Sequence, residues 1–330
     1  FVWSTVFSRS SFVIEVRYFV FLQEVMLWIH GGSFMSGSAS EYHCELLASM
    51  EDVVVVAINY RLNILGFFTT GDSKAPGNYG LWDQKLAIEW VKENIEDFGG
   101  DPTKITLFGE SAGGRAVAFQ MFSPQNNVSL FQKAITESGS ALSLTYLNRD
   151  PMPVTNKVGE KLKCNITEDL LKCMREKSLL NLMEAVGEVS RPFPFYPVVD
   201  GEFVPYDLGE MLADYTSNGK EAVSNKIGDF AKYGLMSGWN DQEGLLYLGR
   251  LKAANQRLTG NDTLDEGVSQ QALVAALHDY PFYRYGGSKY TEDLAVQVFT
   301  DYYMRTPHSL YSDGKSVEDR RVEVYMNIAG

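Results

Sequence analysis

The sequence predicts an α/β protein with a mostly parallel central sheet flanked by helices, and two observations predict this class. First, three short apolar runs, 25–29, 53–59 and 105–108, are separated by polar or glycine-rich turns. Unbroken apolar runs of this length are typical of strands buried on both faces, as in a parallel sheet. Second, the stretch 79–96 repeats apolar residues at helical spacing between the last two runs. Strand, helix and strand in this order form a βαβ unit with parallel strands.

The composition supports a globular protein and excludes several classes of partner. The chain is 45% hydrophobic and 22% charged, which is enough apolar mass for a large core. No apolar run reaches the length of a membrane span, so we expect none. The net charge is −13 without a basic patch, which argues against nucleic acid and anionic membranes as partners. Oligomeric state is left open.

The first residues are atypical. The chain starts with Phe1 rather than Met, and residues 1–24 are rich in aromatic and β-branched side chains. They lack the basic, apolar and small-residue order of a signal peptide. Such a composition favours one or two strands. We expect a single domain over residues 1–330 that is incomplete, with 1–24 as an atypical N-terminal segment.

The remaining elements follow from apolar patterns and their terminators. A helix is predicted after the third strand, and Ser123-Pro124 stops it. Amphipathic helix dominates 151–186, and a proline-rich passage then turns at Asp200-Gly201. In chain order we predict helix at 112–121, strand at 131–136, helix at 151–186, loop at 192–205, strand at 234–240, mainly helix at 250–310 and strand at 322–326.

Residues 108–114, FGESAGG, contain the pattern G-x-S-x-G directly between a predicted strand and a predicted helix. This context indicates a nucleophile elbow of the α/β-hydrolase fold. The turn must be tight, and glycines two residues either side of Ser111 leave the backbone room. The helix that starts at Ala112 would direct its amides and its positive dipole end at the reacting oxygen. Ser111 is therefore the candidate nucleophile.

A second glycine-rich turn, WIHGGSF at 28–34, also follows an apolar strand. Acyl transfer builds negative charge on the carbonyl oxygen, which backbone N–H groups can stabilise. An HGG-type loop upstream of the serine is typical of this role. We predict an oxyanion hole formed by the amides of Gly31, Gly32 and Ala112.

The third component is an acid that follows the serine along the chain and orients a histidine. Two candidates, Asp241 and Glu243, stand in the loop after the strand at 234–240. Any surface loop is acidic, so the residues alone do not choose between them.

The stretch from Val25 to Leu142 resembles the type-B carboxylesterase and cholinesterase family. The segments that carry the resemblance are WIHGGSF at 28–34, VVVVAINYRL at 53–62, GNYGLWDQ at 77–84, FGGDPTKITLFGESAGG at 98–114 and ESGSAL at 137–142, with CNITEDLLKCMREK at 164–177, PVVDGEFVP at 197–205 and GWNDQEG at 238–244 as thinner matches. The resemblance implies an α/β-hydrolase acting on carboxylic esters. It also implies Ser111 as nucleophile, Gly31, Gly32 and Ala112 as oxyanion hole, and Glu243 rather than Asp241 as acid. No metal or organic cofactor is implied.

The sequence departs from the family pattern at the histidine that serves as the catalytic base. The family's histidine lies beyond a strand that 322–326 resembles, and the chain stops at Gly330. The histidines present are His30 in the oxyanion loop and His43, His278 and His308, none of which stands in the expected motif. We therefore expect the domain to be truncated at both ends and its base to lie outside the chain. Without a base, a serine is a weak nucleophile.

Two further departures concern single residues. The family's first disulfide loop has no counterpart in residues 1–24, which leaves Cys44 over as a predicted buried free thiol. Arg115 stands where the family usually has a small residue, and the sequence offers no physical account of it.

The three cysteines include a close pair, Cys164 and Cys173, and an odd count leaves one unpaired. A disulfide there would close a loop that resembles the family's second disulfide loop. Asn-X-Ser/Thr sequons stand at Asn127, Asn165 and Asn261. Together these features favour a secreted glycoprotein or a secretory-pathway protein.

The sequence thus predicts a serine esterase framework that acts on a small-molecule ester. The alternative is a catalytically impaired binding or adhesion protein on the same scaffold, as in cholinesterase-like adhesion proteins. An intact GESAGG argues against that alternative, and the absent histidine favours it. Which ester would be the substrate stays open, with a general carboxylesterase favoured because the gorge's aromatic segment is absent.

Overall fold

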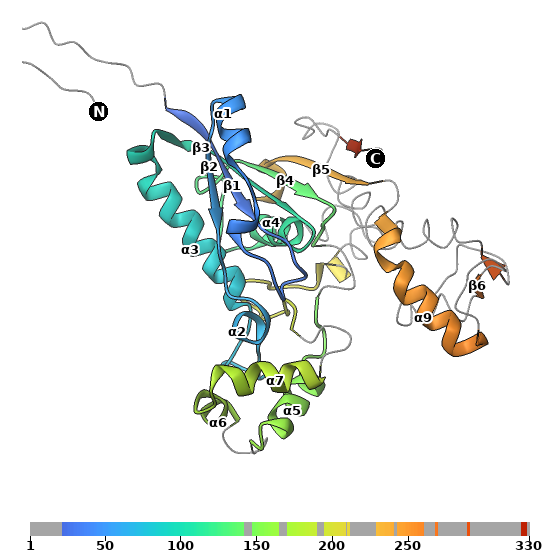
Figure 1. Ribbon diagram of the computed structural model, residues 1–330. Coiled ribbons are helices and arrows are strands. Elements are labelled where there is room, and N and C mark those ends of the chain that lie inside the picture. Colours follow the sequence, from blue (N-terminus) through green and yellow to red (C-terminus); the bar gives the residue numbers. More distant parts are fainter. Residues whose placement is uncertain are drawn as a thin grey trace, which may run out of the picture.

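The computed structural model describes residues 22–141, 147–164, 170–189, 195–208, 210–211, 229–240 and 243–260, with three short strands at 268–269, 289–290 and 325–328. Its centre is a six-stranded sheet in the order β2-β1-β3-β4-β5-β8, and every pair in it is parallel (Figure 1). The strands are β1 (Gln23–Ile29), β2 (Val54–Ile58), β3 (Gly100–Glu110), β4 (Lys133–Glu137), β5 (Gly234–Asn240) and β8 (Tyr325–Ile328). The predicted parallel α/β architecture is confirmed.

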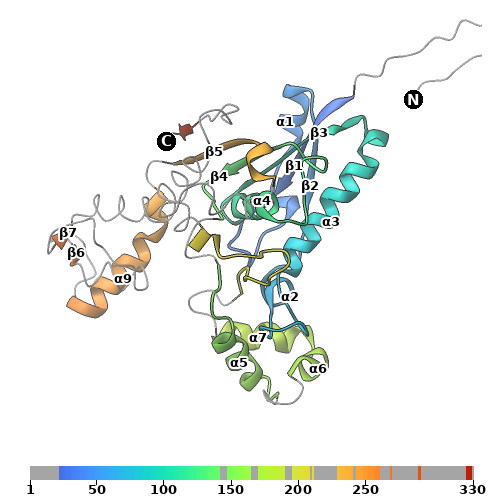
Figure 2. The same ribbon diagram turned by 180° about the vertical axis from the view of Figure 1, so that it is seen from behind.

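Helices flank this sheet. They are α1 (Glu45–Glu51), α2 (Asn63–Phe67), α3 (Tyr79–Asn94), α4 (Ala112–Phe122), α5 (Met152–Lys161), α6 (Leu170–Arg175), α7 (Leu179–Val189) and α9 (Leu248–Thr259), with 3-10 turns η1 (Ala39–Glu41), η2 (Ile95–Phe98), η4 (Phe230–Lys232) and η5 (Glu243–Tyr247). Helices α3 and α4 pack on β3 and on each other, whereas α1 packs on β2. Helices α5, α6 and α7 form a group beyond α2, as both views show (Figures 1 and 2).

The order of the strands determines where a ligand can approach. The chain runs from β1 to β2 on one side, then returns to place β3 on the other side of β1. Ligands of open α/β sheets bind outside the carboxyl ends of the strands at such a reversal. The segments that leave β1 and β3 are the loop 30–37 and the turn at Ser111, so both candidate motifs lie at the reversal.

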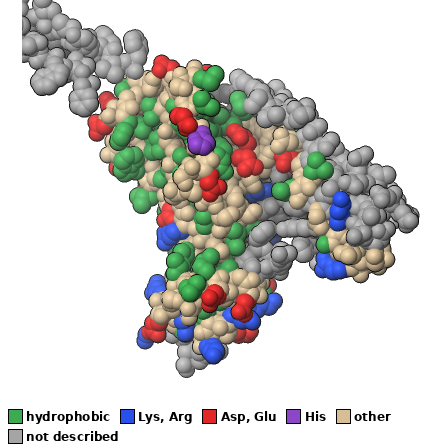
Figure 3. Space-filling view, viewed as in Figure 1, with side chains coloured by type: hydrophobic (Ala, Val, Ile, Leu, Met, Phe, Trp, Pro, Cys, Tyr) green, Lys and Arg blue, Asp and Glu red, His purple; other side chains and the backbone are tan. Residues whose placement is uncertain are grey.

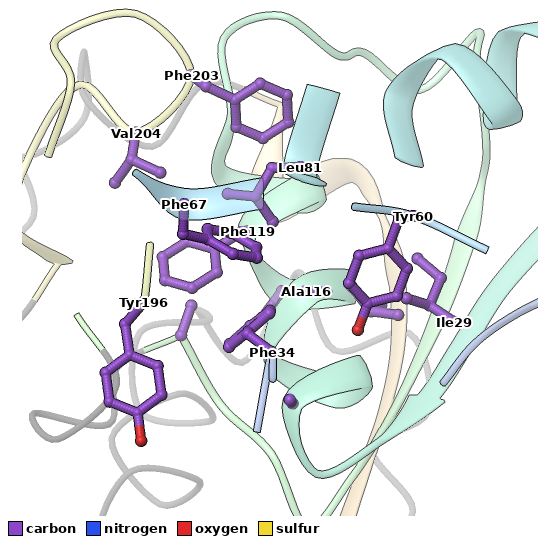
Figure 4. Packing of buried hydrophobic residues seen from close by; sticks show 14 of the residues in the cluster. Ile29, Phe34, Tyr60, Phe67, Leu81, Ala116, Phe119, Tyr196, Phe203 and Val204 are labelled. Carbon is purple, nitrogen blue, oxygen red and sulfur yellow. The ribbon is translucent and has the colours of Figure 1, made fainter. Parts of the chain in front are cut away.

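One continuous apolar core joins the sheet, the helices and the loop at 195–204. Figure 4 shows part of it, with Phe34, Phe67 and Phe119 between the labelled side chains of the other elements. The loop is in the core because Phe203 is fully buried and meets Trp82 of α3 edge to face, with 5.0 Å between the ring centroids. Burying an aromatic ring removes a large apolar area from water and so stabilises the fold. A loop without helix or strand is thereby fixed against α3.

Asn78, the residue before α3, also holds this loop. Its side chain is fully buried and its backbone is left-handed, with a φ of 58°. The amide nitrogen donates to Val198 O and Asp200 Oδ2, each at 2.8 Å, and the amide oxygen accepts from Val198 N–H at 2.9 Å. Two of the sequence motifs, around 77–84 and 197–205, are therefore one structural unit.

Several predicted elements differ in detail. The helical stretch 151–186 consists of three helices, α5 to α7. The stretch 250–310, predicted as mainly helical, contains α9 and also an antiparallel pair, β6 (Val268–Ser269) and β7 (Lys289–Tyr290). Strand β3 begins at Gly100, five residues before the predicted strand, and β8 begins three residues after the predicted 322. The predicted strands within residues 1–21 lie outside the described residues.

The predicted pairing of Cys164 with Cys173 is confirmed, but the predicted burial of Cys44 is not. Cys164 and Cys173 form a disulfide with 5.7 Å between their Cα atoms. Cys44 is free, but it is half-buried rather than buried, so the prediction of a buried thiol is wrong. Burial and the neighbouring Glu45 still raise the pKa of its thiol.

The surface over α1 and α3 carries large exposed apolar side chains. They are Leu46 and Met50 on α1, Leu86 and Trp90 on α3, and Phe98 of η2. Hydrophobic atoms gather on this part of the molecule in the space-filling view (Figure 3). Within the described ranges, no helix combines the length and hydropathy needed to cross a bilayer.

Candidate active site

Ser111 occupies the single residue between β3 and α4. Its φ of 56° and ψ of −119° lie in a region that residues other than glycine seldom adopt. The backbone is held there from both sides, because Ser111 N–H donates to Glu137 O at 2.8 Å and Ser111 O accepts from Arg115 N–H at 3.0 Å. Strained backbone costs about 1–3 kcal/mol per residue and persists where the surroundings enforce it, most often at functional sites. The turn is therefore enforced by β4 and α4 together.

Gly113 allows this turn to approach β1. A Cβ added to Gly113 would lie 2.0 Å from Ile29 O, far inside any real contact. The approach brings the residues after β1 alongside the serine. A Cβ added to Gly31 would lie 3.2 Å from Ser111 Cβ and 2.7 Å from Glu110 O. Gly31 and Ser111 are therefore in direct contact, although 80 residues separate them in the sequence.

The other two predicted donors, Gly32 and Ala112, directly follow Gly31 and Ser111 in the chain. Ala112 is fully buried as the first residue of α4, next to Ser111. Gly32 begins a tight turn in which its carbonyl accepts from Met35 N–H at 3.0 Å and Ser36 N–H at 3.1 Å. Burial raises the pKa of the Tyr42 hydroxyl and Glu110 raises it further, whereas hydrogen bonding to the Gly31 backbone lowers it. The net direction for Tyr42 is upward.

Glu243 is the first residue of η5, shortly after the carboxyl end of β5. Its Oε1 accepts from the Ser138 hydroxyl, from Asn240 N–H at 2.9 Å and from Asn240 Nδ2 at 3.1 Å. Ser138 directly follows Glu137, whose carbonyl holds Ser111. A path of neighbouring contacts thus connects Glu243 to the serine turn. The competing candidate Asp241 lies outside the described residues.

Two carboxylates that the sequence motifs did not single out also lie at this site. Burial raises the pKa of Glu110, and Glu243 and Glu137 raise it further, whereas Arg115 lowers it. Burial also raises the pKa of Glu137. Their position next to the motif residues, inside GESAGG and ESGS, was the only signal in the sequence.

Arg115 has a physical explanation in the structure that the sequence did not offer. Its side chain is almost fully buried, at 1% exposure, one helical turn after Ser111. Buried charges are tolerated where opposite charges compensate them. The guanidinium favours the ionised form of Glu110 and so offsets part of the repulsion among the carboxylates.

Neither described histidine forms a hydrogen bond with Ser111. His30 is fully buried in the loop after β1 and stacks on Tyr60. His43 is exposed and lies 3.2 Å from Glu45 Oε1. His278 and His308 lie outside the described residues. Within the described ranges, no cluster of three or more histidine, cysteine, aspartate or glutamate side chains could hold a metal ion.

The chain is similar to known proteins over most of its length. The sequence profile of the carboxylesterase family matches residues 22–328. Human neuroligin-3 is 39% identical over 260 residues, covering 78% of this chain and 29% of the relative. Bile salt-activated lipase from Bos taurus is 39% identical over 243 residues, covering 68% and 38%, and the human protein is 43% identical over 208 residues, covering 58% and 28%. The chain thus spans well under half the length of these relatives.

Proposed function

Because the chain belongs to the carboxylesterase family, we propose that it is the framework of a serine hydrolase of carboxylic esters, with Ser111 as the nucleophile. The observation that carries the proposal is the enforced turn at Ser111, with its positive φ and Gly31 packed against it. A nucleophile elbow requires a serine raised between a strand and a helix, beside an upstream glycine loop. One relative is named as a lipase, which agrees with ester chemistry.

In the proposed mechanism Ser111 Oγ attacks the ester carbonyl, and its proton passes to a histidine. That histidine comes from outside the described residues, and Glu243 orients it and stabilises the cation that forms. The alcohol leaves with the proton, and water hydrolyses the acyl-enzyme by the same route. The negative carbonyl oxygen receives hydrogen bonds from the amides of Gly32 and Ala112, which are ready without reorganisation. The Gly31 amide joins them where the oxyanion replaces the Tyr42 hydroxyl.

The compartment follows from the same set of features. The Cys164–Cys173 disulfide indicates an oxidising environment. The sequon residue Asn127 is exposed and its side chain accepts from Ser129 N–H at 2.9 Å in a surface turn, so it is accessible to glycosylation. We place the protein in the secretory pathway or outside the cell.

Hydrolysis of p-nitrophenyl butyrate by the full-length protein tests the proposal. Ser111→Ala should lower kcat by about 10⁶-fold, as loss of a triad nucleophile does elsewhere, while the melting temperature stays close to that of the parent. Ser49→Ala, at an exposed position of α1, is the control and should keep full activity. Retention of activity in Ser111→Ala would refute the assignment.

The second candidate is a binding protein that keeps the scaffold without catalysis. The observation in its favour is that neither described histidine forms a hydrogen bond with Ser111. A fluorophosphonate distinguishes the two, because it labels a serine only when a base activates it. Labelling of the parent but not of Ser111→Ala supports the esterase, and no labelling of the full-length protein supports the binding protein.

A further inference from the structure

The two peptide groups after β1 are each held by a buried side chain. Tyr60 Oη donates to His30 O at 2.8 Å, and His30 Nδ1 lies 2.8 Å from Gly31 O. A carbonyl oxygen only accepts, so the His30 proton is on Nδ1 and Nδ1 is the donor. Both side chains are buried, at 6% and 0% exposure. Burial raises the pKa of the Tyr60 hydroxyl, which keeps it a donor.

Holding a carbonyl also sets the direction of an amide. A peptide group is planar and trans, so its C=O and N–H point in opposite directions. The Tyr60 hydroxyl fixes the peptide between His30 and Gly31, and thereby the Gly31 N–H. The His30 ring fixes the next peptide, and thereby the Gly32 N–H.

The two side chains also support each other. Their rings stack with 4.6 Å between centroids and an angle of 22°. Tyr60 follows β2 and His30 follows β1, so the contact joins the carboxyl ends of two adjacent strands. Figure 4 shows the Tyr60 ring close to Ile29, the last residue of β1, in the packed interior. Both donors are therefore fixed by packing before any substrate arrives, which is the condition for a preorganised site.

We propose that Tyr60 and His30 are positioning residues that fix the orientation of the Gly31 and Gly32 amides toward the developing oxyanion. This inference rests on the proposed esterase function and deepens it. Neither side chain touches the substrate in this proposal. Each acts through a peptide group, by a hydrogen bond to the carbonyl on the opposite side from the functional N–H.

The proposal specifies which nitrogen of His30 matters. Its Nε2 is buried and accepts no hydrogen bond from the part of the chain that the structure describes. Nδ1 is the ring nitrogen that forms a hydrogen bond with the loop, at Gly31 O. Asparagine can present its amide nitrogen near the position of Nδ1, whereas leucine fills the same space without a donor. His30→Asn should therefore restore what His30→Leu loses.

The experiment compares Tyr60→Phe with Tyr233→Phe in the full-length protein. Tyr233 is equally suited to the substitution, because it is 1% exposed and stacks on Phe131 at 4.6 Å instead of on the loop. With p-nitrophenyl butyrate, Tyr60→Phe should lower kcat by about ten-fold, less than the roughly 10²–10³-fold of losing a whole oxyanion donor. KM should change little. Affinity for a trifluoromethyl ketone, which forms a bound oxyanion, should fall in parallel with kcat. Tyr233→Phe should leave both unchanged, and His30→Asn should recover most of the loss seen in His30→Leu.

A Tyr60→Phe protein that keeps as much kcat as Tyr233→Phe would overturn the proposal, as would a loss confined to KM. If the parent hydrolyses no ester, the proposed function has failed, and the positioning role is then judged by crystal structures. Rotation of the peptides at 30–31 and 31–32 in a Tyr60→Phe/His30→Leu double variant supports it. Unchanged peptide planes in that variant overturn it.

Discussion

At the scale of single residues, Gly113 gives the sharpest stability test. Gly113→Ala should destabilise the protein by several kcal/mol, because the new methyl group would lie 2.0 Å from Ile29 O and would separate β1 from the serine turn. Gly187→Ala is the matched control, since it is also a helical glycine and its added Cβ meets no atom within 4 Å. That variant should gain about 0.5–1 kcal/mol from better helix propensity.

Urea unfolding of both variants measures these effects as shifts of the midpoint at constant slope. We expect Gly113→Ala to lower the midpoint and Gly187→Ala to raise it. Equal effects in the two helices would show that the approach of β1 to α4 is not tight, and would remove the basis for placing Gly31 against Ser111.

Glu110 should make stability depend on pH. Its pKa in the folded protein is raised, so the folded state binds this proton more tightly than the unfolded state does. The free energy of unfolding therefore falls as pH rises from the ordinary glutamate value through the raised one. The Glu110→Gln variant lacks this carboxyl and so does not lose that free energy as pH rises. Its free energy of unfolding, relative to that of the parent, should therefore be higher at pH 7.5 than at pH 4.

Urea unfolding at these two pH values checks the prediction. Because Arg115 lowers the Glu110 pKa, the benefit of Glu110→Gln at pH 7.5 should be larger in an Arg115→Met background. Glu93→Gln, at an exposed position of α3, is the control and should show a smaller difference between the two pH values. A benefit of Glu110→Gln that grows toward low pH would contradict a raised pKa for this carboxyl.

At the scale of elements, the tie between α3 and the loop at 198–200 depends on one side chain. Asn78→Gly keeps the left-handed backbone that this position needs but removes three hydrogen bonds to the loop. Buried backbone groups of Val198 then lose their partners, so the loss should be about 2–4 kcal/mol. Thermal or urea unfolding measures it.

Asn94→Gly, at the other end of the same helix, is the comparison. Its side chain donates to Trp90 O within α3 and crosses to no other element. We expect a loss of about 1 kcal/mol or less there. A loss at Asn78 no greater than at Asn94 would mean that the loop is held by Phe203 packing alone.

The helices and strands were predictable where their burial produces a recognisable pattern of apolar residues in the sequence. Strand β2 is an unbroken apolar run, β1 ends in one, and β5 runs from Gly234 into a polar loop, and the predicted ranges coincide with all three within two residues. The first half of β3 was not predictable, because GDPTK at 100–104 has no apolar run and only its Gly100 is in register with β1, opposite Gln23. Strands β6 and β7 have two residues each, too few for any period to show.

At the scale of the whole molecule, the parts of the candidate site that the sequence could indicate are those carried by contiguous motifs. Ser111, the glycine loop and Glu243 each stand in such a motif. The hydrogen bond from Ser138 to Glu243 joins residues 105 positions apart, and the hydrogen bond from Tyr60 to His30 joins residues 30 apart. No local pattern encodes these pairings, because the strand order of the sheet creates them.

That strand order has a consequence for synthesis on the ribosome. Val25 pairs with Ile105, and Lys133 pairs with Gly234, so neighbours in the sheet are made far apart in time. Pairings between distant segments form slowly, because a long loop must close first. The Ser111 amide cannot form its hydrogen bond until Glu137 has been synthesised, and Ser138 cannot form its hydrogen bond until Glu243 has been synthesised. The nascent chain therefore carries Ser138 for more than a hundred residues of translation before Glu243 can accept its hydrogen bond.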